Sequence, residues 1–247
     1  TPSTRNLNSG SSVTGAGAMN VINFNDTVNF NAGSDYNLGG GLTVNSGAVS
    51  FTAGTITDLG STLDQSGGTL SLNDGNTHSL TNLNLTAGTL QGSDDLIVTS
   101  AFTFGGSTAD AILRGSGTLT TNAGVTTTLA TNATSGPDAY LNDTRAWSNF
   151  GTVNWATTIN NGLILNGTST FTNETGGIFN VNVTDTFSDI AGTGTFNNAG
   201  TLNKTTTGIT DIDVSFNNTG TVNINNASGA LEFGRGGTDT GDYVVTL

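Results

Sequence analysis

Residues 196–204 read Phe-Asn-Asn-Ala-Gly-Thr-Leu-Asn-Lys, and residues 216–224 read Phe-Asn-Asn-Thr-Gly-Thr-Val-Asn-Ile. The two segments begin 20 residues apart, and looser copies of the same phrase begin at Trp147 and Phe171. In each copy, apolar residues alternate with Asn or Thr on both sides of a Gly, which is typical of a strand, a tight turn and a second strand. A repeat of this length predicts stacked structural units.

We interpret each copy as part of one coil of a β-solenoid. Turns at Gly47, Gly68 and Gly88 are spaced by 21 and 20 residues, so the same period extends into the N-terminal half. Alternate side chains of a strand point to opposite faces, and the inward ones would stack in rows along the solenoid axis. The residues that define the structural repeat are Trp147, Phe171, Phe196, Gly200, Leu202, Phe216, Gly220 and Val222.

The chain lacks a convincing helical period, because Gly, Asn and Thr disfavour helix interiors and good helix formers are sparse. The sequence therefore predicts an all-β fold, a right-handed parallel β-helix with coils of roughly 20 residues. Roughly 11 such coils would form a rod on the order of 50 Å long. The repeated Asn residues predict hydrogen-bonded side-chain ladders along the axis.

The domain organisation follows from where this period begins. Residues 1–18 are rich in Ser, Gly, Thr and Asn, and we expect a polar N-terminal segment or linker there. Residues 19–247 predict a single solenoid domain, with an excursion loop near residues 131–143 around Pro137. The last residues resemble another strand without a polar cap. We therefore expect that the natural protein continues or that this end docks on another copy.

Composition excludes several classes of function. The chain has 18 acidic and 5 scattered basic residues, with a net charge of −13, which disfavours binding to nucleic acid or to an anionic membrane surface. It has no Cys, which excludes disulfides and thiolate chemistry. Hydrophobic residues make up 34% and charged residues 9%, unlike the composition of disordered chains. No apolar run approaches the ~20 residues of a membrane-spanning helix.

Two further segments strengthen the repeat pattern. Residues 80–90 read Leu-Thr-Asn-Leu-Asn-Leu-Thr-Ala-Gly-Thr-Leu, and residues 236–243 read Gly-Gly-Thr-Asp-Thr-Gly-Asp-Tyr. With the two Phe-Asn-Asn-x-Gly-Thr phrases, they resemble the repeats of autotransporter-like and filamentous-haemagglutinin-like bacterial surface proteins. This resemblance covers about two-thirds of the chain. It implies a long right-handed β-helix outside the cell, a stalk or passenger, and it supplies no catalytic motif.

Three closely spaced acidic pairs are candidate cation sites: Asp94 with Asp95, Asp211 with Asp213, and Asp239 with Asp242. Carboxylates spaced by one residue on a strand share a face, where they could hold Ca²⁺ weakly or act as acid and base in glycoside cleavage. We favour solvated corner residues, because the sequence has no Asp-x-Asp-x-Asp-Gly loop or Gly-Gly-x-Gly-x-Asp repeat. No catalytic or cofactor-binding residue is assigned.

The single His and the aromatic residues are the other site candidates. His78 lies in a polar segment, and we expect it on the surface and not in a triad or metal site. Tyr140, beside the expected loop, is the candidate for stacking on a sugar ring. Trp147 takes the Phe position of the repeat and is expected in the core. The sequence does not decide whether Trp155 faces the core or the solvent. Tyr36 and Tyr243 are further candidates for sugar stacking.

Together these features favour an extracellular structural rod of a bacterial surface protein: an adhesin stalk, a passenger or a fibre subunit, without enzymatic activity. Three alternatives stay open: a carbohydrate-binding adhesin tip, a subunit of a filament polymerised end to end, and a polysaccharide lyase or hydrolase. The expected partners are copies of the chain itself, glycans or a host surface. Neither nucleic acid nor membrane insertion is expected.

Overall fold

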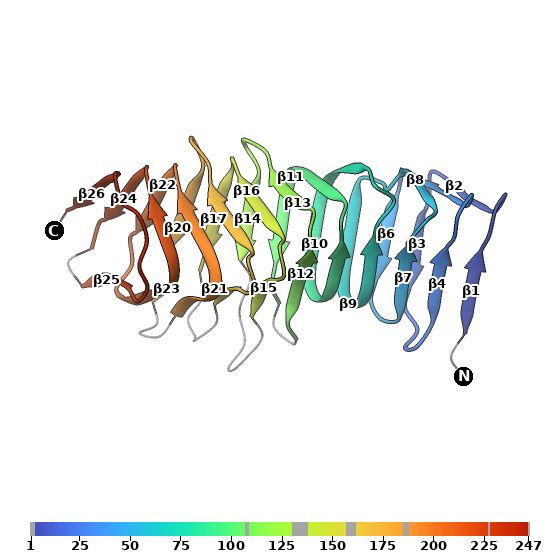
Figure 1. Ribbon diagram of the computed structural model, residues 1–247, viewed down its shortest axis with the longest axis horizontal. Coiled ribbons are helices and arrows are strands. Elements are labelled where there is room, and N and C mark those ends of the chain that lie inside the picture. The colour runs from blue at the N-terminus through green and yellow to red at the C-terminus, as the bar shows by residue number, and fades with distance from the viewer. Residues whose placement is uncertain are drawn as a thin grey trace.

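A computed structural model describes residues 3–106, 109–129, 138–156, 162–184, 188–226 and 228–246 of the chain. Within these residues the regular structure consists of 26 β-strands and no helix. The strands form one elongated stack of about ten turns, and the N- and C-termini lie at opposite ends (Figure 1). The prediction of an all-β parallel solenoid is confirmed, while the right-handed sense of the coil stays a prediction.

The coils build three ladders of parallel strands, each running along the axis. Ladder 1 consists of β1 (Thr4–Leu7), β4 (Thr27–Phe30), β7 (Ala48–Phe51), the second part of β9 (Thr62–Leu72), the last part of β10 (Thr77–Gly92), β12 (Ala111–Gly115), β15 (Ala139–Leu141), β18 (Leu163–Leu165), the first parts of β21 (Ser188–Asn198) and β23 (Gly208–Asn218), and β25 (Gly229–Phe233). Ladder 2 consists of β3 (Ala18–Val21), β6 (Gly41–Val44), the first part of β9, the middle of β10, the second part of β11 (Asp95–Phe104), β14 (Thr126–Leu129), β17 (Thr152–Trp155), β20 (Ile178–Val181), β22 (Thr201–Lys204), β24 (Thr221–Ile224) and β26 (Asp242–Val245). Ladder 3 consists of β2 (Ser12–Gly15), β5 (Asp35–Leu38), β8 (Thr55–Asp58), the first parts of β10 and β11, β13 (Thr118–Thr121), β16 (Ala146–Asn149), β19 (Thr170–Asn173), and the second parts of β21 and β23.

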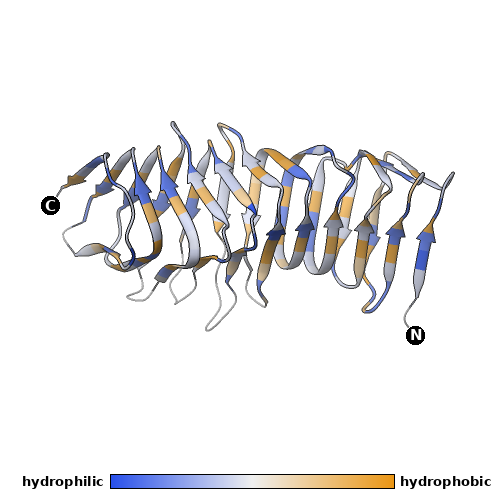
Figure 2. Ribbon diagram, viewed as in Figure 1, coloured by the Kyte–Doolittle hydropathy of each residue, from blue (hydrophilic) through white to orange (hydrophobic). Residues whose placement is uncertain are grey.

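The two near-identical phrases are neighbours in this stack. Phe196 pairs with Phe216, and Leu202 pairs with Val222, so the phrases lie side by side in exact register. Their inward residues join one continuous apolar core, and matching apolar bands recur on successive strands in Figure 2. Because alternate residues of a strand face the interior, the sequence pattern alone places these side chains.

Aromatic side chains form a row inside ladder 3. The ring of Trp147 lies 4.7 Å from that of Phe171, which lies 4.9 Å from Phe196, which in turn lies 5.3 Å from Phe216. These rings meet edge to face, the arrangement that aromatic quadrupoles favour. The row confirms the inward placement predicted for the repeat aromatics.

Two different constraints explain the corner glycines. Gly68 and Gly88 have φ angles of 62° and 83°, which side chains rarely adopt. At Gly220 the constraint is space, because an added Cβ would overlap the carbonyl oxygen of Gly200 in the coil below. The repeated Gly of the phrase is therefore needed for close approach between coils.

The predicted asparagine ladders are present. The buried ladder runs inside ladder 3, where each Nδ2 donates to the Oδ1 one coil further on: Asn149 to Asn173 at 2.9 Å, Asn173 to Asn198 at 2.9 Å, and Asn198 to Asn218 at 2.8 Å. A second, half-buried row faces outward on ladder 2, with 2.9 Å bonds that link Asn154, Asn180, Asn203 and Asn223. Both rows follow from identical residues repeated at the coil spacing.

The N-terminal segment differs from its prediction. Within the expected linker, β1 pairs with β4 and β2 pairs with β5, so these residues form the first coil of the solenoid. Polar outward residues hide the alternation there, because Leu7 and Val13 are among the few apolar inward residues. Of the expected loop near 131–143, residues 131–137 lie outside the described residues, and residues 139–141 form strand β15 instead of a loop.

Candidate functional site

Ladder 3 is interrupted between β8 and β10, so β2, β5 and β8 form a separate three-stranded sheet. At this break the Ile56 amide of β8 donates to Oδ2 of Asp74 at 2.8 Å. Asp74 lies in the corner between β9 and β10. Elsewhere in the ladder, such a backbone amide donates to a carbonyl of the neighbouring strand. At the break, the carboxylate of Asp74 accepts this hydrogen bond instead.

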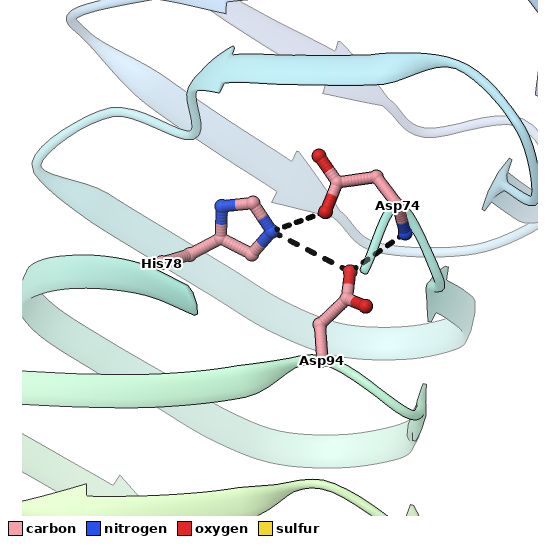
Figure 3. Close-up of side chains that lie close together, drawn as sticks. All are labelled: Asp74, His78 and Asp94. Atoms are coloured by element: carbon pink, nitrogen blue, oxygen red, sulfur yellow. Dashed lines mark hydrogen bonds and ion pairs between the residues drawn. The ribbon is translucent and has the colours of Figure 1, made fainter. Parts of the chain in front are cut away.

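Three side chains converge at this corner (Figure 3). The Nε2 atom of His78 lies 3.1 Å from Oδ1 of Asp74 and 3.4 Å from Oδ2 of Asp94. The side chain of His78 is 6% exposed, and those of Asp74 and Asp94 are 1% and 0% exposed. His78 takes an inward position of β10 and pairs with Leu96, so it occupies a column that is otherwise apolar in the neighbouring coils.

Backbone amides hold both carboxylates. Asp94 accepts from the amides of Asp74 and Gly75, each at 2.9 Å, through different oxygens. Asp74 accepts from the amide and the side chain of Asn76, each at 3.0 Å, in addition to Ile56. Burial raises the pKa of Asp74, but these hydrogen bonds and the charge of His78 outweigh it and leave the pKa below its ordinary value. Asp74 is therefore ionised at neutral pH.

A buried arginine lies behind the cluster. Arg145 is 2% exposed, and its Nη1 donates to the carbonyl oxygen of Asp94 at 3.0 Å. Burial lowers the pKa of Arg145 to about 10, opposed by the carboxylates of Asp95 and Asp94. The guanidinium crosses Gly117, where a Cβ would lie 2.7 Å from Nη1. Its positive charge therefore lies close to the carboxylates of Asp94 and Asp95.

The structure corrects two predictions at this corner. The expectation of a surface His is wrong, because His78 and Leu80 are the inward residues of the first part of β10. Asp94 and Asp95 do not act as a pair, because Asp94 is buried while Asp95 is exposed and accepts from the Thr118 amide at 2.6 Å. The 20-residue period could have predicted that Asp74 and Asp94 lie close together, because they are 20 residues apart and so occupy equivalent places on successive coils.

A second acidic group lies on the outer face of ladder 1. Asp189, Asp211 and Glu232 are in register on successive strands, and Asp213 lies beside them. With Phe233 they line a hollow of about 280 Å³. The predicted common face of Asp211 and Asp213 is confirmed by the alternation along β23. Burial, followed by the charges of Asp211, Asp138 and Asp213, raises the pKa of Asp189.

The aromatic candidates for sugar stacking divide into buried and accessible residues. Tyr36, Trp147 and Trp155 are fully buried in the core. Tyr140 faces outward on β15, half-buried, and its hydroxyl donates to Asp138 at 3.4 Å. Tyr243 is 43% exposed on β26. Tyr140 and Tyr243 are thus the accessible tyrosines that could meet a ligand.

The remaining acidic pair does not form a closed site. Asp239 and Asp242 are both exposed near the C-terminal end. Asp239 accepts from the Gly241 amide at 3.1 Å and from Asn218 at 3.4 Å, so it terminates the buried asparagine ladder. Its carboxylate is thereby engaged in capping the solenoid corner.

Sequence reasoning also missed a buried lysine. Lys204 is fully buried at an inward position of β22, and its ammonium donates to the Val183 carbonyl at 2.8 Å, to Thr206 Oγ1 at 3.1 Å and to the Thr207 carbonyl at 3.3 Å. Burial lowers its pKa to about 8. In the repeat, Lys204 aligns with Trp155 and Ile224, and this alignment with apolar residues could have predicted its inward position.

Comparison of the chain with protein-family models, with curated proteins and with solved structures found no match. The described residues contain no helix of the length and apolarity needed to cross a bilayer. Any function must therefore be argued from the geometry of the chain itself.

Proposed function

We propose that the chain is an extracellular structural rod of a bacterial surface protein, a stalk, passenger or fibre subunit. The observation that carries this proposal is the continuity of two buried rows in ladder 3. The aromatic row and the asparagine ladder run in parallel from β16 to β23 without a change of register. In these coils the buried side chains pack against each other and form hydrogen bonds along the axis, as we expect of a rod that serves as a spacer.

Such rows would give the rod axial stiffness. Each coil hydrogen-bonds to the next through backbone ladders about 4.8 Å apart, and the amide rows add side-chain bonds in the same direction. The acidic surface, with a net charge of −13, and the lack of Cys are compatible with life outside the cell. The resemblance of the repeats to those of surface proteins supports the same location.

The location is tested on the source bacterium with antibodies raised against the purified chain. We expect labelling of intact cells and loss of the epitope after brief protease treatment. Labelling that requires permeabilised cells would reject the extracellular assignment. Small-angle scattering of the purified chain tests the shape, and a rod on the order of 50 Å long is expected. Growth of the particle along its axis with concentration would support the end-to-end filament.

Polysaccharide cleavage is the second candidate function, and the hollow beside Asp189 is the observation that favours it. Acid–base catalysis needs carboxyl groups whose pKa values are pushed apart, and Asp189 has a raised pKa beside Asp211 and Asp213. The assay is chain cleavage on a panel of acidic and neutral polysaccharides. Loss of cleavage in Asp189→Asn and Asp211→Asn, but not in the exposed control Asp242→Asn, would support it. No cleavage of any polysaccharide would reject it.

A further inference from the structure

We propose that Asp74, His78 and Asp94 bind one divalent transition-metal ion of the zinc class, which cross-links successive coils where ladder 3 is interrupted. This site goes beyond the rod function and does not depend on it. The three residues come from the corner before β10, from β10 itself and from the corner before β11. A shared ion would therefore tie together two turns of the solenoid.

The distances between the ligand atoms fit a metal. Ligands about 2.1 Å from one ion lie roughly 3.0 to 3.4 Å apart in octahedral and tetrahedral geometry. The separations from His78 Nε2 are 3.1 Å to Asp74 and 3.4 Å to Asp94. One ligand atom from each residue lies within 4.8 Å of the others. The imidazole nitrogen and two carboxylate oxygens are a donor set that zinc-class ions accept.

A metal explains the convergence better than a proton does. A single Nε2–H can point well at one acceptor, whereas both carboxylates approach the same nitrogen atom. An ion placed between the three atoms would meet all of them at once.

The surroundings already orient the ligands. The backbone amides of Ile56, Gly75 and Asn76 donate hydrogen bonds to the carboxylates. Hydrogen bonds of this kind usually orient the side chains that bind a metal. Two further charged groups lie beside the ligands: Arg145, which donates to the Asp94 carbonyl oxygen, and Asp95, the residue after Asp94. Gly75 and Asn76 are exposed in the covering corner, which leaves an ion a short route from solvent.

The test uses the full chain without a histidine tag, treated with EDTA and then titrated with Co²⁺. We expect one Co²⁺ per chain with visible ligand-field absorption, its displacement by Zn²⁺, and a Zn²⁺-dependent rise in Tm. A chain that binds no stoichiometric Co²⁺ at millimolar concentration and shows no rise in Tm would overturn the proposal. This wild-type result decides the question even if a ligand variant fails to fold.

Matched variants locate the ion. His78→Gln and Asp94→Asn should each weaken Co²⁺ binding by more than about 100-fold, beyond the 10- to 100-fold typical of outer-shell changes. Asn76→Ala should fall within that smaller range, because its side chain only orients Asp74. Asp95→Asn is the control and should bind as the wild type does. Binding that survives His78→Gln but is lost in Asp211→Asn would assign the ion to the acidic hollow and reject this site.

Discussion

Ladder 3 buries polar groups in two regions by opposite means. From β16 to β23 it holds neutral amides, one per coil, and each satisfies the next. At the break between β8 and β10 it holds two carboxylates and an imidazole, where strand pairing is missing. The first arrangement needs the repeat to be regular, and the second occurs where it is not.

The difference shows what translational symmetry does for a solenoid. An amide has a donor and an acceptor, so identical copies stacked at one spacing satisfy each other without any further partner. A carboxylate has acceptors only, so stacked copies would repel and need donors from elsewhere. At the break the backbone supplies those donors, because the amides of Ile56, Gly75 and Asn76 are not used in ladder 3.

Cutting the amide row should have the largest effect. Asn173→Leu preserves approximate size but removes the bonds that Asn173 donates to Asn198 at 2.9 Å and to the Thr201 carbonyl at 3.1 Å. It also removes the Oδ1 acceptor at 2.9 Å from the Asn149 side-chain amide and leaves Asn198 Oδ1 without this donor. Leaving buried polar groups unpaired costs about 1–3 kcal/mol each, so we expect a loss of about 3 kcal/mol or more. Urea denaturation measures this change in the free energy of unfolding.

The matched control for this substitution is Asn197→Leu. Asn197 is half-buried on the outer face of the coil above, where water can replace its bonds to Thr172 and Asn217. Equal losses in Asn173→Leu and Asn197→Leu would contradict the special role given to the buried row.

The sequence predicted the regular region far better than the break. Alternation and a 20-residue period are enough to pair Phe196 with Phe216 and to predict amide ladders. The alternation and the period predict whether a residue faces the core or the solvent, but they do not predict where two neighbouring strands fail to pair. The polar neighbours of His78 predict a surface position, although its place two residues before Leu80 matches the inward alternation. The convergence with Asp74 and Asp94 depends on corner geometry, which no local pattern encodes.

Lys204 is a buried charge inside the regular region, where the buried asparagine ladder consists of neutral amides. Its pKa is about 8 in the folded chain and 10.5 when exposed, so between these values the unfolded chain binds more protons. The free energy of unfolding should therefore rise with pH, by up to about 2 kcal/mol between about pH 8 and 9.5. Below this range the buried ammonium lowers stability.

Lys204→Met should remove that dependence, since a thioether does not titrate. Denaturant titrations at several pH values, with both chains in the same buffers, give the difference directly. The range stops below the pKa of exposed tyrosine, near 10, so that tyrosine ionisation does not contribute. Parallel curves for the wild type and Lys204→Met would show that Lys204 is not the titrating group.

The smallest effect is expected on the outer amide row. In Asn203→Ala the bonds to Asn180 and from Asn223, both 2.9 Å, are lost. Because these side chains are half-buried, solvent can take over both partners, and the cost should stay near or below about 1 kcal/mol. A similar value for Asn173→Leu would mean that spacing, and not burial, sets the strength of an amide row. A loss at Asn203 as large as that predicted for Asn173 would instead show that the outer row is a principal axial tie of the rod. The two substitutions, measured in one denaturation series, therefore separate burial from repetition as the source of stability.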